Sequence, residues 1–264
     1  MTSLCIGGAS YKGFTFLGAL HYLDTKNYLS LLKNFYGTSI GAIIGIFYII
    51  GIKPFDILQF FLNINLEDIC DFDINNITNS YSIISNKFFI YVSNMFQKFE
   101  NKNITIKEFI KKYEININIY AVSLKKKKII NFNTSEYENI SVLDAIIASS
   151  SIPIIFPPVK FNNEYFVDAC LKSIDGILDD ISEGYTFRLY YDENDNNINN
   201  LTNYLTQLVY AGMTSHNIIK SNINTLDIEL PNKFKTKFNF NDIKNSDKIE
   251  LFYIGLVQAQ SFYK

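Results

Sequence analysis

The chain has 264 residues with 24 basic and 26 acidic side chains, a formal net charge of −2 and a hydrophobic fraction of 48%. These values exclude the strongly basic field on which nucleic-acid binding generally depends, and they provide enough apolar residues for one substantial core. The three cysteines, Cys5, Cys70 and Cys170, form an odd and scattered set, which favours reduced thiols over a disulfide framework.

The N-terminus and the apolar runs bear on location. No basic segment followed by an apolar stretch opens the sequence, so no signal peptide is predicted. The longest unbroken run of apolar residues and glycine, Gly41–Ile52, is shorter than the roughly 18–20 residues of a membrane span. The sequence therefore predicts a cytoplasmic protein without a transmembrane segment, and peripheral contact with a membrane stays open.

The start of the chain predicts two strand–glycine–helix units. The letters SLCI precede a glycine pair, and four apolar residues from Phe16 to Leu23 then recur at helical spacing. Residues 31–37 (LLKNFYG) predict a second strand, and Ile40–Gly51 predicts a second helix. Two such units in succession predict an α/β domain with a mainly parallel sheet.

Residues 54–103 differ from the units before them, because they are rich in Phe and Asn and predict a cap-like helical region. Six apolar residues in this region form one stripe at helical spacing: Ile84, Phe88, Tyr91, Val92, Met95 and Phe99. The simpler interpretation packs this helix on the core. The alternative makes it a cap whose apolar face meets lipid.

The middle of the chain predicts two capped helices and a hairpin. A capping box at Thr105–Glu108 begins a helix that ends near Tyr113, and Ser141 with Asp144 begins another. Alternating strands flank Lys125–Lys128 between these helices. Four lysines at a hairpin tip are typical of a solvated turn, and the alternative is contact with an anionic membrane surface.

The remaining elements complete one domain. The letters EYFVDAC predict a short strand with Asp168 at its end, and YTFRLYY and LDIELP predict two more strands. Helices are predicted around residues 201–220, and Asp247 with Glu250 opens the last one. Neither a repeat nor a linker interrupts the pattern, so residues 1–264 are predicted to form a single domain.

Ser39 lies between two glycines in a pattern that matches the G-x-S-x-G nucleophile elbow. Gly37 and Gly41 would let a strand reverse sharply into a helix, where any Cβ would crowd the turn or the substrate. The helix that follows would place its positive end near a developing oxyanion. The pattern predicts a nucleophilic Ser39, and the alternative is a serine that caps an apolar helix.

A nucleophilic serine needs a base, and the chain offers two arrangements. His21 is predicted to pack in the first helix, but the order Ser39, Asp168, His216 is compatible with a hydrolase triad. In the second arrangement Asp168 contacts Ser39 directly as a dyad. A free aspartate has a pKa of about 3.9, so this dyad requires an enclosed site that raises the pKa.

A second glycine cluster, with Gly7, Gly8 and Gly13, precedes the elbow. It matches neither the dinucleotide fingerprint nor the P-loop spacing. Its backbone N–H groups could instead form an oxyanion hole, and the alternative is a tight turn between strand and helix.

Four segments together resemble the patatin-like phospholipase family over nearly the whole chain: GGASYKGFTFLGALHYL, FYGTSIGAIIG, LDAIIASSSIPIIFPPVKFNNEYFVDAC and KIELFYIGLVQAQSF. The third is the most specific, since an Ala-Ser-Ser-x-x-Pro-x-x-Phe-x-Pro run precedes a strand that ends in aspartate. The resemblance implies a three-layer α/β/α sandwich related to the α/β hydrolases. It also implies hydrolysis of glycerolipid acyl esters by a Ser-Asp dyad, with no catalytic histidine, metal or cofactor.

The resemblance assigns roles to particular residues: nucleophile Ser39, catalytic acid Asp168, oxyanion loop Gly7, Gly8 and Ala9, and loop-supporting residues Lys12 and Gly13. Two positions depart from the family. Ala9 replaces the third loop glycine, and Asp168-Ala169-Cys170 replaces an Asp-Gly-Gly/Ala run. Alanine fits where φ is negative and is costly where φ is positive.

Two functions follow from these residues. The first is a lipid acyl hydrolase of the phospholipase A type, with a phospholipid substrate, peripheral membrane contact and no nucleic-acid partner; the need for a protein activator stays open. The alternative, motivated by Ala9 and Ala169, is a catalytically silent lipid-binding or scaffold protein on the same fold.

Overall fold

The computed structural model describes residues 2–64, 76–172, 184–189, 204, 224–235 and 243–263. The strands in these ranges are β1 (Ser3–Ile6), β2 (Asn34–Gly37), β3 (Asn116–Ser123), β4 (Lys128–Asn131), β5 (Val159–Phe161), β6 (Glu164–Asp168), β7 (Tyr185–Leu189) and β8 (Thr225–Ile228). The α-helices are α1 (Phe14–Thr25), α2 (Ile40–Ile49), α3 (Pro54–Leu62), α5 (Asn76–Ser80), α6 (Lys87–Gln97), α7 (Ile106–Tyr113), α8 (Val142–Ser149), α10 (Asn232–Lys235) and α11 (Asn245–Phe262). Two short 3₁₀ helices are η1 (Ser10–Gly13) and η2 (Ala169–Leu171).

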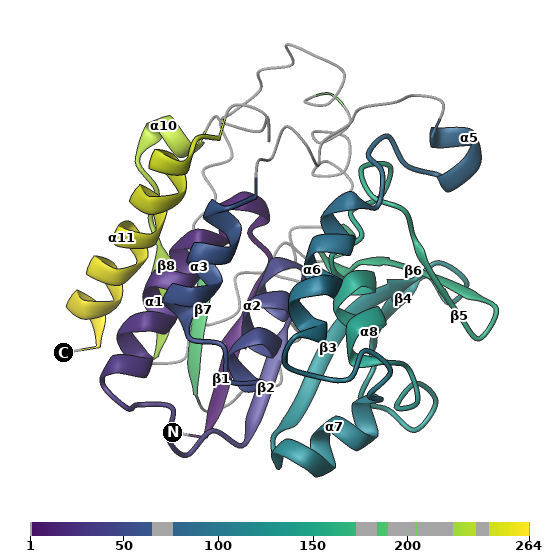
Figure 1. The fold of residues 1–264 in the computed structure, drawn as a ribbon, viewed down its shortest axis with the longest axis horizontal. Helices are drawn as coiled ribbons and strands as arrows, with labels where there is room; N and C mark the ends of the chain where they lie inside the picture. Colours follow the sequence, from purple (N-terminus) through teal and green to yellow (C-terminus); the bar gives the residue numbers. More distant parts are fainter. Residues whose placement is uncertain are drawn as a thin grey trace.

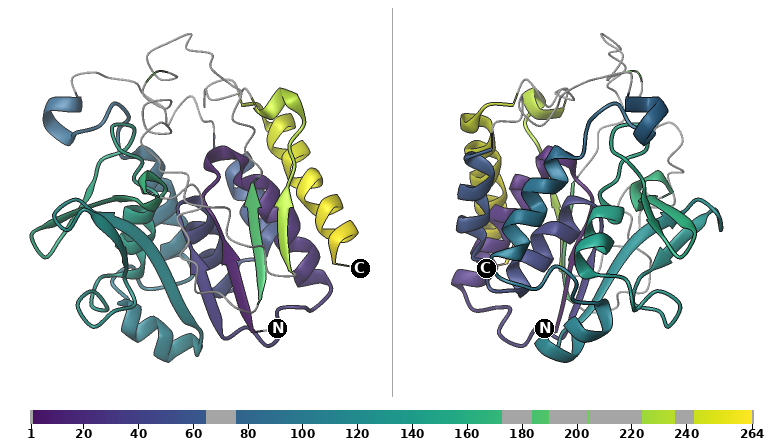
Figure 2. Two further views of the ribbon diagram at one scale, coloured as in Figure 1. Left: turned by 180° about the vertical axis from the view of Figure 1, so that it is seen from behind. Right: turned by 45° about the vertical axis from the view of Figure 1, so that its right-hand side comes forward.

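The strands form one mixed sheet in the order β5-β6-β3-β2-β1-β7-β8, with β4 also paired to β3. The pairs from β3 through β2, β1 and β7 to β8 are parallel. The pairs of β3 with β4 and β6, and of β6 with β5, are antiparallel. Helices flank this sheet, as in an α/β/α sandwich (Figures 1 and 2). The predicted α/β class with a mainly parallel sheet is confirmed.

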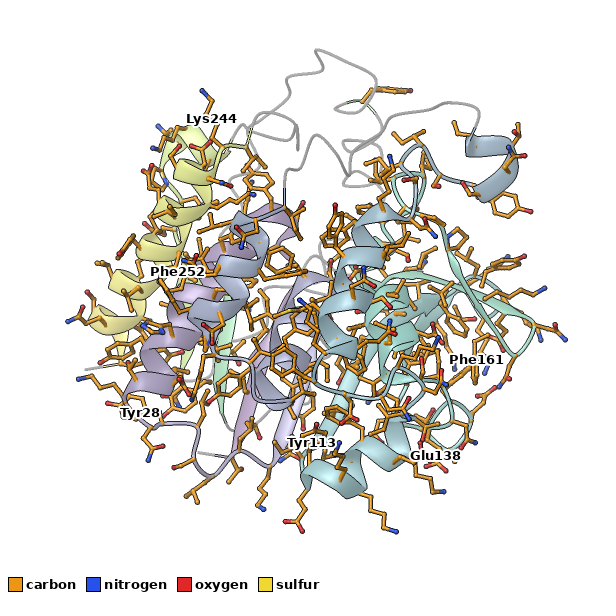
Figure 3. All side chains as sticks on the ribbon, viewed as in Figure 1. Tyr28, Tyr113, Glu138, Phe161, Lys244 and Phe252 are labelled. Carbon is orange, nitrogen blue, oxygen red and sulfur yellow. The ribbon has the colours of Figure 1, made fainter. Side chains whose placement is uncertain are left out.

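Helices α1, α3 and α11 lie side by side at one end of the sheet (Figures 1 and 2). The ring centroid of Phe252 in α11 lies 5.6 Å from that of His21 in α1 and 6.3 Å from that of Phe55 in α3 (Figure 3). Such aromatic contacts add to the burial that holds helices onto a sheet. Within the described ranges, no helix combines the length and the apolar character that crossing a bilayer requires.

Most predicted elements are present with small shifts. The capping box at α7 is complete, since Glu108 donates its N–H to the Thr105 hydroxyl and accepts the Thr105 N–H at 2.9 Å. The second strand begins at Asn34 and is shorter than the predicted residues 31–37. Helices predicted for 201–220 and Cys70 lie outside the described residues, apart from helical Tyr204.

The apolar stripe predicted between Ile84 and Phe99 is partly wrong. Helix α6 begins only at Lys87, and its buried face includes Phe89 and Phe96, which the prediction left out. Tyr91 is 40% exposed, and Phe99, which lies past the end of the helix, is 49% exposed. The helix therefore packs on the core through a neighbouring face, and the simpler interpretation fits its buried residues.

Candidate active site

Ser39 lies at a sharp turn between β2 and α2. Its backbone has φ 55° and ψ −133°, a conformation that costs a non-glycine residue about 1–3 kcal/mol. Glycine beside it is required by space, because a Cβ on Gly41 would lie 2.3 Å from the carbonyl oxygen of Ile6. A Cβ on Gly37 would similarly lie 2.8 Å from Cα of Ala42. The elbow can therefore press against the end of β1.

Ser149, at the end of α8, holds the elbow in place. The backbone N–H of Ser39 donates to Ser149 Oγ at 2.9 Å, and this hydroxyl donates to the carbonyl of Tyr120 in β3 at 2.6 Å. All three groups are buried, so each would lose its partner if the bridge were absent. No role for Ser149 was predicted, although the serine run that contains it belongs to the most specific of the four segments.

Asp168 reaches the same place from β6. Strand β3 lies between β2 and β6, with Gly37 paired to Ile119 and Asp168 paired to Ala121. Neighbouring strands lie about 4.8 Å apart, so the ends of β2 and β6 approach each other within the span of two side chains. The register of two strand pairs thus brings Ser39 and Asp168 together, although they are far apart in sequence.

The Asp168 carboxylate is almost fully buried, with 1% of the residue exposed. Burial raises its pKa from 3.8 to about 6, although hydrogen bonds from Ser39 and Cys170 oppose the rise. Its Oδ1 accepts the N–H of Cys170 at 2.9 Å. Its Oδ2 has no hydrogen-bond partner among the described residues, and the Ser39 hydroxyl is close enough to lower the pKa of the carboxyl group.

The predicted glycine loop runs past Ser39 after β1. A Cβ on Gly8 would lie 3.4 Å from Cβ of Ser39, so this turn is adjacent to the nucleophile candidate. Gly7 does not fit the predicted role, because its N–H donates to the carbonyl of Phe187 in the sheet at 3.2 Å. Among the three loop residues, Gly8 and Ala9 stay as candidate oxyanion donors.

Neither alanine that departs from the family pattern strains the backbone. Ala9 has φ −153°, and Ala169 belongs to the right-handed turn η2. The residue of this loop with positive φ is Ser10, at 51°. The structure thus removes the backbone reason for expecting these substitutions to misplace the site.

Lys12 and Gly13, to which the resemblance assigns support of the loop, lie between the glycine loop and α1. The N–H of Lys12 donates to the carbonyl of Ala9 at 3.0 Å, and its own carbonyl accepts the Thr15 hydroxyl at 2.8 Å. A Cβ on Gly13 would lie 2.8 Å from Cγ2 of Ile40. This small residue lets the start of α1 approach the elbow.

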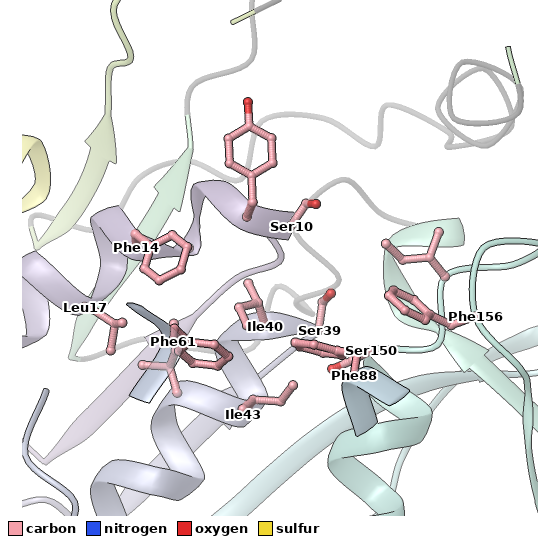
Figure 4. A pocket seen from close by; sticks show the side chains of 14 residues that line it. Ser10, Phe14, Leu17, Ser39, Ile40, Ile43, Phe61, Phe88, Ser150 and Phe156 are labelled. Carbon is pink, nitrogen blue, oxygen red and sulfur yellow. The ribbon is translucent and has the colours of Figure 1, made fainter. Parts of the chain in front are cut away.

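Ser39 opens into an apolar pocket, which holds about 760 Å³ of atom-free space including its opening to solvent (Figure 4). Six of its apolar lining residues are Phe14, Leu17, Ile43, Phe61, Phe88 and Phe156. Phe61 and Phe88 come from the predicted cap-like region, which therefore forms part of the wall. The apolar character of these walls suits a hydrocarbon chain.

The histidines do not join the described part of this site. His21 packs against the rings of Phe55 and Phe252 on the outer face of α1. His216 lies outside the described residues, so the triad alternative stays a prediction. Within the described ranges, no group of three or more His, Cys, Asp or Glu side chains is arranged to hold a metal ion.

Comparison with known sequences gives a family and a viral relative. The family model described as "Patatin-like phospholipase" matches residues 4–176. "Probable lipid hydrolase 463L" of Invertebrate iridescent virus 6 is 30% identical over 173 residues, which cover 63% of this chain and 58% of that protein. The chain therefore spans a little more than half the length of this relative.

Comparison with solved structures gives the fold. VipD from Legionella pneumophila superposes with a TM-score of 0.55 at 14% identity, covering 99% of this chain and 66% of VipD. The type III effector ExoU of Pseudomonas aeruginosa gives a TM-score of 0.54 at 12% identity, covering 99% of this chain and 52% of ExoU. At these identities the likeness concerns the fold, and it confirms the predicted sandwich.

Proposed function

Because the chain belongs to the patatin-like phospholipase family, whose model covers residues 4–176, we propose that it is a lipid acyl hydrolase that cleaves glycerophospholipids with a Ser39–Asp168 dyad. The observation that carries this proposal is the buried Asp168 carboxylate, with a pKa raised to about 6, beside a serine on a strained elbow. A base with this pKa is charged at neutral pH and still takes up a proton readily.

The reaction begins when Ser39 Oγ attacks the ester carbonyl carbon and Asp168 accepts the hydroxyl proton. The N–H groups of the Gly8–Ala9 turn and the N-terminus of α2 stabilise the tetrahedral oxyanion. Collapse breaks the ester bond, Asp168 gives its proton to the leaving alcohol, and the acyl group stays on Ser39. Water then attacks this ester, with Asp168 as base, and the fatty acid leaves as the proton returns to Ser39.

The pocket supports a lipid substrate. Its aromatic and aliphatic walls would take the acyl chain out of water, at about 0.8 kcal/mol per buried CH₂ group. Ser10 and Ser150 also line the pocket, so the acyl chain would lie in an apolar space with a few polar groups near Ser39. An esterase for small polar esters would gain little from such walls.

Contact with a membrane is the expected way to reach a phospholipid substrate. The tip of the β3–β4 hairpin has side chains that suit such contact. The β3–β4 hairpin exposes Leu124 with Lys125, Lys127 and Lys128. The N–H of Leu124 donates to the carbonyl of half-exposed Tyr165, which extends the edge with an aromatic ring. Tyrosine suits a membrane–water interface, and each lysine near an anionic surface contributes about 1 kcal/mol.

We expect the triple substitution K125Q/K127Q/K128Q to weaken cosedimentation with anionic vesicles by at least tenfold, because three lysines together contribute about 3 kcal/mol. The matched control changes three exposed lysines at and before α7, K98Q/K102Q/K111Q, and leaves binding within about threefold. Equal losses in both variants would show that only net charge matters.

A fluorophosphonate probe tests the dyad directly. We expect one adduct, mapped to Ser39 by mass spectrometry, at a rate that falls about tenfold per pH unit below pH 6. The sign follows from the base: below its pKa Asp168 is protonated and cannot accept the serine proton. Ser150→Ala, which removes another hydroxyl from the same pocket, should label normally.

Other outcomes of the labelling experiment point elsewhere. Lipid binding without any adduct would support the silent alternative. Loss of the adduct in His216→Ala would support the triad instead of the dyad.

A further inference from the structure

Cys170 lies two residues beyond the proposed base, within η2. Its backbone N–H donates to Asp168 Oδ1 at 2.9 Å, and both this N–H and its thiol lower the pKa of the carboxyl group against the effect of burial. The residue is half-buried.

The thiol also contacts the glycine loop from the other side. A Cβ on Gly8 would lie only 2.3 Å from Cys170 Sγ, which means that the sulfur fills the space beside Cα of Gly8. The next nearest heavy atom to this added Cβ is Cβ of Ser39, at 3.4 Å. The sulfur therefore sits between the proposed base and the proposed oxyanion turn, next to the nucleophile.

We propose that Cys170 is a positioning residue for hydrolysis, whose thiol donates to Asp168 and packs on Gly8. The thiol thereby keeps the Asp168 carboxylate and the Gly8–Ala9 turn at a fixed distance from each other, on either side of Ser39. This inference rests on the proposed function and deepens it. It assigns a purpose to a side chain that departs from the glycine or alanine of the family pattern.

The surroundings of Asp168 make such a donor important. Among the described residues, its pKa is influenced by burial, Ser39 and Cys170, and by no charged side chain. Because Oδ2 lacks a hydrogen bond of standard geometry there, the orientation of the carboxylate depends on few donors. A thiol is a weak donor, but a hydrogen bond to a charged acceptor is stronger than a neutral one.

The first test compares Cys170→Ala with Cys170→Ser. We expect Cys170→Ala to lower kcat about tenfold with little change in KM, since it removes a hydrogen bond to a charged group without touching the pocket. The acid limb of the kcat–pH profile of this variant should also move to higher pH, because losing a donor to the carboxylate raises the pKa of Asp168 further. Cys170→Ser keeps an O–H donor and should recover most of both changes.

The second test adds a methyl group at Gly8 and then removes the Cys170 side chain that this methyl group would meet. Gly8→Ala should lower kcat about a hundredfold, because the new Cβ pushes the turn or the thiol by about 1 Å. Adding Cys170→Gly removes the sulfur, and the double variant should recover at least tenfold over Gly8→Ala alone.

Two results would overturn the positioning role: an unchanged acid limb in Cys170→Ala, or no recovery in the double variant. The carboxyl ¹³C shift of Asp168, followed against pH, measures the same titration without turnover. If the wild type neither hydrolyses lipids nor labels at Ser39, the proposed function fails, and this titration still decides whether the Cys170 thiol donates to Asp168. An unchanged midpoint in Cys170→Ala would then refute the contact itself.

Discussion

Ser39→Ala should reduce phospholipid hydrolysis to background, a loss on the order of 10⁶-fold, and Asp168→Asn should reduce kcat by about 10²–10⁴-fold. The first variant removes the attacking oxygen. The second keeps the size of the side chain but removes the base. In the proposed dyad both residues act in the same proton transfer, so the double variant should be no worse than Ser39→Ala alone. Fatty-acid release from mixed vesicles measures all three variants.

The stability of Asp168→Asn separates a catalytic role from a structural one. Burial raises the pKa of Asp168 in the folded protein, so the charged carboxylate weakens folding above pH 6, and this penalty fades as the pH falls toward 3.8. Asparagine cannot carry that charge. We therefore expect Asp168→Asn to melt no lower than the wild type at pH 8, while its activity is lost.

The dyad would be contradicted by two outcomes. Hydrolysis that survives in Ser39→Ala would require another nucleophile. A large fall in Tm for Asp168→Asn at pH 8, in step with its loss of activity, would show that the carboxylate serves the fold instead of the reaction.

The sequence predicts those parts of the site whose signals are local. Gly37 and Gly41 flank Ser39 at fixed spacing. Both belong to one turn in which neighbouring backbone atoms leave no room for a side chain at either glycine. The position of Asp168 at the end of a short strand was also predicted locally, although its role came from the family resemblance. A turn or a strand end can be read from a few neighbouring residues, because the geometry involves only those residues.

The sequence could not predict contacts that depend on register between distant strands. Ser149 meets Ser39 only because α8 ends beside β3, and the Gly7 N–H enters the sheet only because β7 pairs with β1. Tyr91 and Phe99 were placed in the core stripe, because helical periodicity alone does not say where a helix ends or which face meets the sheet. The match between Cys170 and Gly8 is of the same kind.

Gly41→Ala should lower kcat/KM about a hundredfold, and here the elbow itself is tested. The added Cβ would lie 2.3 Å from the carbonyl oxygen of Ile6 and 2.5 Å from that of Gly7. Both atoms belong to the backbone, so the clash can be relieved only if the elbow and the end of β1 move apart by about 1 Å. A shift of this size would separate Ser39 from the proposed oxyanion donors and cost about two orders of magnitude in rate.

The same substitution should also destabilise the fold by about 1–3 kcal/mol, which is typical of overpacking. Loss of stability alone could lower activity, so the control must lose stability without moving the elbow. Gly51, which follows the other end of α2, has φ 98° and nothing within 4 Å of an added Cβ. Gly51→Ala therefore costs about 1–2 kcal/mol of backbone strain and leaves the site untouched.

The pair of glycine variants makes the comparison decisive when kcat/KM is measured well below both melting temperatures. We expect the two variants to melt at similarly lowered temperatures, while only Gly41→Ala loses its rate. Gly41→Ala with a rate within threefold of wild type would mean that the elbow tolerates displacement. Equal rate losses in both variants would mean that stability, and not the spacing between Ser39 and the glycine loop, limits hydrolysis. Because the two substitutions add the same methyl group at the two ends of one helix, a difference in rate reports the position of Ser39.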